Sequence, residues 1–279
     1  MSDIKVEICV DSVESAVAAQ TGGAHRVELC DNLMEGGTTP SFGSIEVAKK
    51  LLDIKLHVII RPRGGDFLYS ETEFEIMKRD IEAAKKLGVD GIVIGLLDSD
   101  GNIDTQRTAE LVELSRPMTV TFHRAFDVCR DPLKAIDELA EIGVDRILTS
   151  GQEATAVEGL DMLADCVRHA ASRITIMACG NLNERNINKV VATTGVKEVH
   201  FTAFADVASG MRFRNERVFM GGTLRPPEYS RSVTDAGRVA SIKSLAIDGT
   251  RRRPWHAPGR YPRAVSKQSE RTALFARKV

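Results

Sequence analysis

A short pattern that recurs four times along the chain most constrains its fold. The segments GGAHRVELC (22–30), LGVDGIVIG (87–95), IGVDRILTS (142–150) and TGVKEVHFT (194–202) each join a glycine, a short polar turn and a run rich in β-branched residues. Glycine is favoured just past the end of a helix, where the backbone becomes left-handed. A β-branched run is typical of a strand that is buried on both faces. The pattern therefore indicates helices that alternate with strands of a parallel sheet.

The rest of the chain extends this alternation to eight strands. We expect strands near 6–10, 26–30, 57–61, 91–97, 119–124, 146–150, 174–179 and 198–202, with amphipathic helical segments between them. Thr39 and Pro40 predict one helix start, with Thr39 as the N-cap. Eight strand–helix units over about 200 to 250 residues favour a (β/α)8 barrel of the TIM type. A doubly wound open sheet is the alternative, but no G-x-G-x-x-G fingerprint follows the first strand.

The C-terminal part of the chain has a different character. A long loop (204–230) follows the eighth expected strand, and a last helix near 229–247 would close the barrel. From Gly249 to the end the chain holds nine Lys or Arg residues and one acidic residue, and it is rich in proline. We therefore expect a barrel domain over 1–247 and a basic, disordered tail over 248–279.

Composition narrows the class of protein. The 38 basic and 39 acidic residues leave a net charge of −1, which argues against nucleic-acid binding by the whole protein. The sequence shows no secretory signal and no apolar run long enough to span a membrane, so we expect no membrane association. The five cysteines form no C-x-x-C pair, which favours reduced thiols and a cytosolic location over disulfides or a zinc finger.

Strand alternation predicts an unusually polar barrel interior. Because apolar positions on each strand should face the helices, the other positions should face the barrel axis. These inward residues are Glu7, Cys9, Glu28, Cys30, Arg61, Thr121, His123, Glu198, His200 and Thr202. Barrel interiors are usually filled by Val, Ile and Leu. Arg61 is the expected partner of Glu7 and Glu28. Two interpretations stay open, namely a structural layer of ion pairs or a polar pocket where barrel active sites lie.

The second interpretation predicts an enzyme that acts on a small anion, either a carboxylate or a phosphate. Arg61 and Arg63 lie in a glycine-containing loop suited to holding such an anion. His123 at the end of the fifth strand would move protons together with a glutamate. The catalytic candidates are therefore Glu7, Glu28 and His123, and the substrate-binding candidates are Arg61, Arg63, Thr149, Ser150 and His200. Arg124 is expected to pair with Asp127 instead of facing the axis.

Two cysteines raise the question of a metal site. Cys9 and Cys30 each lie two residues beyond an inward glutamate, on neighbouring strands about 4.8 Å apart. Paired thiolates suit Cu(I), which is a soft ion. Spacing alone favours the alternative that both are small buried apolar residues, as free cysteines usually are. The segment DSDGNID (98–104) lacks the spacing of a calcium loop and is expected to be a turn into the next helix.

Six blocks in order carry a family resemblance. They are EICVDSVESA (7–16), RVELCDNLMEGGTTPS (26–41), IIRPRGGDFLYS (59–70), VTFHRAFD (120–127), RILTSG (146–151) and SGMRFRN (209–215). These blocks resemble the copper homeostasis protein CutC family, its animal members more than its bacterial ones. The resemblance implies a (β/α)8 barrel, copper handling with Cu(I) at Cys9 and Cys30, a homo-oligomer, and a cytoplasmic or cytoplasmic and nuclear location. Copper binding is thus the first hypothesis, the enzyme is the second, and a partner-binding barrel with a filled interior is the third.

Overall fold

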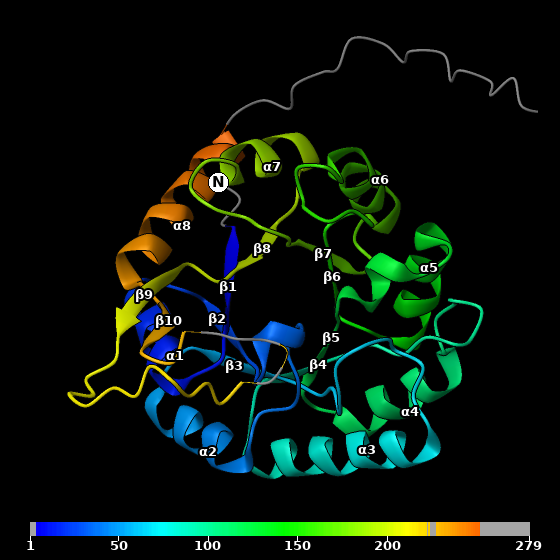
Figure 1. Cartoon of the computed structure of the whole chain (residues 1–279). Coiled ribbons are helices and arrows are strands. Elements are labelled where there is room, and N and C mark those ends of the chain that lie inside the picture. Colours follow the sequence, from blue (N-terminus) through cyan, green and yellow to red (C-terminus); the bar gives the residue numbers. More distant parts are fainter. Residues whose placement is uncertain (1–3, 222, 224–226, 252–279) are drawn as a thin grey trace, which may run out of the picture.

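Eight parallel strands form a closed barrel that a ring of helices surrounds (Figure 1). The computed structural model describes residues 4–221, 223 and 227–251. The barrel strands are β1 (Lys5–Val10), β2 (Arg26–Leu29), β3 (Lys55–Ile59), β4 (Gly91–Ile94), β5 (Thr119–Phe122), β6 (Arg146–Thr149), β7 (Thr175–Ala178) and β8 (Glu198–Phe201). Each strand pairs with the next along the chain, and β8 pairs with β1. The predicted barrel is confirmed, and the open sheet is excluded.

The helices follow the strands in the predicted alternation. They are α1 (Val13–Thr21), α2 (Phe42–Leu51), α3 (Glu71–Lys86), α4 (Thr105–Ser115), α5 (Pro132–Ile142), α6 (Leu160–Ala170), α7 (Ile187–Thr194) and α8 (Ala236–Arg251). Two short 3₁₀ helices, η1 (Leu33–Glu35) and η2 (Arg124–Val128), follow β2 and β5. Asp104 caps α4, so the DSDGNID segment leads into a helix as predicted.

The N-cap predicted for α2 is wrong by two residues. Ser41 caps this helix, because its hydroxyl accepts a hydrogen bond from the Ser44 N–H. The Thr39 hydroxyl accepts from the Arg61 N–H instead. Thr39 therefore ties the loop after β2 to the end of β3, which brings both loops to the same end of the barrel.

An excursion outside the barrel separates β8 from α8. The strands β9 (Phe204–Ala208) and β10 (Ser230–Thr234) form an antiparallel pair beside α1 and α8 (Figure 1). The predicted helix start near 229 is therefore wrong, since α8 begins at Ala236 and ends at Arg251 rather than near 247. The first four residues of the tail predicted over 248–279 belong to α8, and the rest of it lies outside the described residues. In the described part of the chain, no helix is long and apolar enough to cross a membrane.

The apolar core lies between the strands and the helices. Fully buried side chains of this core come from each of the first five strands: Ile8, Val27, Val58, Ile92 and Val120. Burying such side chains stabilises the fold by roughly 1.5–3 kcal/mol each. The core does not use the side chains that point toward the barrel axis, so these are available for the site described below.

Candidate functional site

A cavity of about 470 Å³ opens at the carboxyl-terminal end of the barrel strands. Its polar lining comprises Cys9, Glu28, Cys30, Glu35, Arg61, His123, Arg124, Cys179, Asn181, His200 and Thr202. Its apolar lining comprises Leu33, Ile59, Phe67, Leu148, Leu182 and Phe201. Active sites of (β/α)8 enzymes lie at this end of the barrel. The cavity is therefore the main candidate for a binding or catalytic site.

Two free thiols meet in this cavity. The Cys9 and Cys30 Sγ atoms lie 3.7 Å apart, and both residues are buried. The Cys30 N–H donates to the Val10 carbonyl, which places the end of β2 beside the end of β1. This separation lets both sulfurs contact one metal ion, while the cavity stays open to a further ligand.

Charged neighbours make the two thiols unequal. The hydrogen bond with Cys30, helped by His200 and opposed by burial, lowers the pKa of Cys9 to about 6. The same hydrogen bond and burial raise the pKa of Cys30 well above its usual range. Burial lowers the pKa of His200, but its bonds to Cys9 and Glu7 outweigh this and raise that pKa strongly. At neutral pH the site therefore holds a Cys9 thiolate, a Cys30 thiol and a His200 imidazolium.

The carboxyl of Glu28 is the fourth ionisable group beside the thiols. Its burial, together with the negative charge on Cys9, raises its pKa well above the usual range. His200 Nε2 lies 3.6 Å from Glu28 Oε2. One ligand atom from each of Cys9, Glu28 and Cys30 lies within 4.8 Å of the others, and the same holds for Glu7, Glu28 and His200. The residues present therefore offer soft sulfur ligands, with oxygen and nitrogen ligands alongside.

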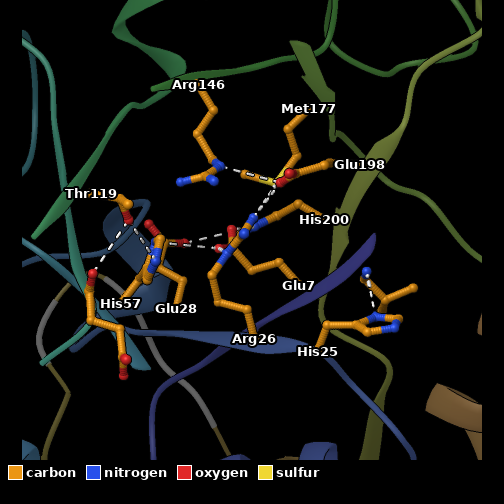
Figure 2. A network of polar contacts seen from close by, with 12 residues as sticks. Glu7, His25, Arg26, Glu28, His57, Thr119, Arg146, Met177, Glu198 and His200 are labelled. Carbon is orange, nitrogen blue, oxygen red and sulfur yellow. Dashed lines mark hydrogen bonds and ion pairs between the residues drawn. The ribbon is translucent and has the colours of Figure 1, made fainter. Parts of the chain in front are cut away.

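A buried ion-pair network lies beneath the cavity (Figure 2). Glu7 accepts a hydrogen bond from His200 Nδ1 at 2.8 Å and another from Arg26 Nε. Arg26 also donates to Glu198 at 2.6 Å, and Arg146 Nε lies 3.3 Å from the same Glu198 oxygen. Burial raises the pKa of Glu7, but the positive charges of Arg26 and His200 outweigh burial and hold this pKa far below its usual range. Glu7 thus fixes the orientation and the charge of His200.

The expected pairing of Arg61 with Glu7 and Glu28 is wrong, because Arg26 pairs with Glu7 and His200 lies beside Glu28. Glu7 and Arg26 are register partners on β1 and β2, whereas Arg61 lies beyond the end of β3. Arg26, His57, Arg146 and Met177 belong to this inner layer and were not among the predicted inward residues. The same alternation contained the signal, since Arg26 lies two residues before Glu28. The sequence left two alternatives open, a structural layer of ion pairs or a polar pocket. The barrel contains both, at different depths.

Arg61 and His123 also line the cavity. The Arg61 guanidinium lies over the Phe67 ring at 5.3 Å, and the Phe67 and His123 ring centroids are 4.9 Å apart. Burial, and next the charge of Arg61, lower the pKa of His123 to about 3. His123 is therefore a neutral imidazole at physiological pH. It can donate a hydrogen bond to a ligand but contributes no positive charge.

The predicted site residues divide into two groups. Cys9, Glu28, Cys30, Arg61, His123 and His200 line the cavity, whereas Glu7, Arg63, Thr149 and Ser150 do not. Arg63 binds Glu73 and Asp66 on the outer side of its loop. The Thr149 and Ser150 hydroxyls both donate to Asp127. Asp127 also pairs with Arg124 at 2.6 Å, as predicted.

Comparisons with known proteins agree with this arrangement. The family model described as the CutC family matches residues 4–205. A CutC family protein of Bacteroides fragilis is 51% identical over 247 residues, covering 88% of this chain and 98% of that protein. The mouse copper homeostasis protein cutC homolog is 48% identical over 243 residues, covering 87% and 89%. The expected closer likeness to animal members is therefore not seen.

Solved structures give the same result. The CutC structure from Streptococcus agalactiae is 38% identical, with a TM-score of 0.69, and the match covers 71% of this chain and 98% of that one. A thiamine phosphate pyrophosphorylase from Pyrococcus furiosus shares only the barrel fold, with 15% identity and a TM-score of 0.55 over 89% and 98% of the chains. On the family match, the curated relatives and the shared barrel, this chain belongs to the CutC family.

Proposed function

We propose that this protein binds Cu(I) through Cys9 and Cys30 and takes part in the handling of intracellular copper. The observation that carries the proposal is the pair of buried thiols 3.7 Å apart in an accessible cavity. Soft thiolate ligands select Cu(I). The names of the mouse and human relatives, which are copper homeostasis protein cutC homologs, support the same role.

The charge of the site favours a monovalent ion. The two sulfurs share one proton, which lies on Cys30 while Cys9 is a thiolate. When Cu(I) displaces this proton, one positive charge replaces another, and the total charge beside His200 stays the same. A divalent ion would add a positive charge next to a buried imidazolium. Zinc usually takes four ligands, and His200, the nitrogen ligand beside the thiols and Glu28, cannot bind a metal while it is protonated. Because a proton leaves when the metal binds, the affinity for Cu(I) should increase with pH.

An anaerobic Cu(I) titration against a competing chelator tests this function. Wild type should bind about one ion tightly, and the Cys9→Ser/Cys30→Ser double variant should lose that binding. Cys166→Ser is the matched control, because Cys166 is equally buried but lies on α6 outside the cavity lining. Tight binding that survives in the double variant would refute the ligand assignment.

The second candidate function is an enzyme that acts on a small anionic substrate. It is favoured by three buried polar atoms in the cavity lining, Glu28 Oε1, Arg61 Nε and His123 Nε2, which have no hydrogen-bond partner in the described part of the chain. Glu28 and His200 would move protons, with Glu7 holding His200, and Arg61 would hold the anion. Native mass spectrometry of the protein purified from its host should then reveal a bound metabolite that Arg61→Ala loses. A protein without a bound metabolite in both samples would count against this function.

We further propose a homo-oligomer, which the family resemblance implies. The segment between β9 and β10 exposes the apolar side chains of Met211, Phe213 and Met220. These side chains are available to contact a second copy of the chain. Light scattering coupled to size-exclusion chromatography should give an oligomer for wild type and a smaller species for Phe213→Ser. A wild-type monomer at high protein concentration would contradict the proposal.

A further inference from the structure

Arg61 is a buried cation without an anionic partner. Its side chain is only 5% exposed, and its terminal nitrogens donate to the carbonyls of Glu35, Gly37 and Gly65 at 2.8, 2.6 and 2.9 Å. These carbonyls are neutral acceptors. Across residues 4–221, 223 and 227–251, no carboxylate oxygen lies within 4.0 Å of the guanidinium. A buried charge is unfavourable unless a counter-ion accompanies it.

The other charged groups of the cavity have their own partners and do not supply that counter-ion. The Cys9 thiolate is stabilised by Cys30 and His200. Arg124 pairs with Asp127 at 2.6 Å, and His200 pairs with Glu7 at 2.8 Å. The Glu35 carboxylate lies at the exposed mouth of the cavity, where it accepts a hydrogen bond from Asn32 Nδ2 at 2.5 Å. Arg61 therefore contributes one uncompensated positive charge to the cavity wall.

Two hydrogen-bond donors on this wall are also unused. Arg61 Nε and His123 Nε2 are buried and have no partner among the described residues. The Ala125 N–H donates to His123 Nδ1 at 3.1 Å, so Nδ1 carries no proton and the neutral ring must carry its proton on Nε2. The Phe67 ring contacts both side chains, and all three line the cavity. Two unpartnered N–H donors and one unpaired charge, grouped around the Phe67 ring, are the elements of a site for an oxygen anion.

We propose that Arg61 and His123 bind the carboxylate of a small organic monoanion, with its hydrocarbon part against the apolar lining of the cavity. A carboxylate has one charge and two oxygens, which match one unpaired cation and two unused donors. Phosphate carries more charge and more acceptor oxygens than this wall satisfies. Leu33, Ile59, Leu148 and Phe201 provide the apolar surface for the body of the ligand.

A carboxylate would be the substrate class of the enzyme in the second proposed function, and the carboxylate site rests on that function because it uses the same cavity. Binding is measured without turnover and on metal-free protein, so the site can exist where no reaction and no copper binding are found. Conversely, if no carboxylate binds, the Cu(I) titration and the search for a bound metabolite still test the two proposed functions independently.

Ligand-observed NMR with acetate, butyrate and benzoate on metal-free protein tests the class of ligand. At least one of these carboxylates should bind, and benzoate should bind about tenfold or more tightly than its neutral isostere benzamide, because a hydrogen bond to a charged group is lost. Inorganic phosphate should bind more weakly than benzoate. The inference is overturned if none of the three carboxylates binds, or if benzamide or phosphate binds as tightly as benzoate.

Two variants test the residues. In His123→Asn, the amide oxygen can still accept from the Ala125 N–H, but no donor remains at the position of Nε2. Arg61→Lys keeps the charge and removes the Nε–H, although it also weakens three loop contacts, so its thermal unfolding is measured alongside. Both variants should weaken benzoate binding by about tenfold. Arg63→Lys is the matched control, because this arginine lies on the same loop but points to Glu73, and it should bind as wild type does.

A spectroscopic measurement separates direct contact from a structural effect. The His123 Nε2–H resonance, observed in ¹⁵N-labelled protein, should be present in the free state and should move when benzoate is added. Benzoate binding with an unmoved Nε2–H resonance would overturn the assignment, as would wild-type affinity in His123→Asn.

Discussion

Lowering the pH from 7 to 5 should destabilise the protein by about 2 kcal/mol through His123 alone. Burial and the charge of Arg61 lower the pKa of this histidine from 6.5 to about 3 in the folded state. In the unfolded chain, His123 takes up a proton as the pH falls below 6.5, whereas the folded protein does not. The unfolded state therefore binds more protons, and the stability contribution is complete above pH 6.5 and lost as the pH falls toward 3.

The size of the effect follows from the two pKa values. At pH 5, protonation stabilises the unfolded chain by RT ln(1 + 10^1.5), which is about 2 kcal/mol, and at pH 7 by about 0.2 kcal/mol. The pKa in the folded state has little influence on this stability change, because a value of about 3 leaves the buried ring neutral at pH 5. The pKa of His57 is also lowered to about 3 by burial, so this residue should add an effect of the same sign.

Urea unfolding of wild type and His123→Asn at both pH values isolates the contribution of His123. Loss of packing makes the variant less stable at pH 7 by an amount that does not depend on pH. At pH 5 the stability difference between the two proteins should be smaller by about 2 kcal/mol, since only wild type still carries the buried imidazole. His57 is present in both proteins and cancels. An identical difference at the two pH values, or a His123 pKa near 6.5 by NMR of the folded protein, would refute the reasoning.

Three further predictions concern the inner layer and the cavity. Arg26→Leu removes the cation that Glu7 and Glu198 share, leaving Glu7 with His200 and Glu198 with Arg146. It should lower the free energy of unfolding by roughly 3–5 kcal/mol in urea titrations, and a loss under about 1 kcal/mol would show that the network is dispensable. Gly95→Ala would place a methyl group against the His123 ring. It should lower the free energy of unfolding by roughly 1–3 kcal/mol and shift the NMR resonances of His123, whereas unchanged resonances would contradict this contact. The rate of Cys9 alkylation by iodoacetamide, followed by mass spectrometry of the Cys9 peptide, should have its pH midpoint near 6. In Cys30→Ala the midpoint should move to higher pH, because the hydrogen bond that stabilises the Cys9 thiolate is lost. An unchanged midpoint would disprove this.

Much of the candidate site could be predicted because strand alternation is a local property. Glu7, Cys9, Glu28, Cys30 and His200 are all buried on the inner side of the barrel, as their positions in the strands predict. The signal for the missed Arg26 was equally local. Arg26 faces the axis one inward position before Glu28, and the register of β1 and β2 sets it opposite Glu7.

Other parts of the site depend on contacts between segments far apart in the chain. Thr149 and Ser150 are occupied by Asp127, which η2 brings to them from more than twenty residues away. The segment at 230–234 is a strand because β9 pairs with it, and its own residues give no comparable signal. The thiol separation of 3.7 Å depends on the stagger between β1 and β2, which the spacing of cysteines along the chain does not define.

The sequence by itself determined the barrel, the family and the set of side chains that face the axis, because turns and alternation are encoded by near neighbours. Only the tertiary structure decided that Arg26 pairs with Glu7, that Arg61 has no anionic partner in the described residues, and that Cys9 carries the thiolate. Pairing in a barrel depends on the register between strands, and ionisation depends on burial and on charges from several strands at once. Neither quantity exists until the barrel is closed.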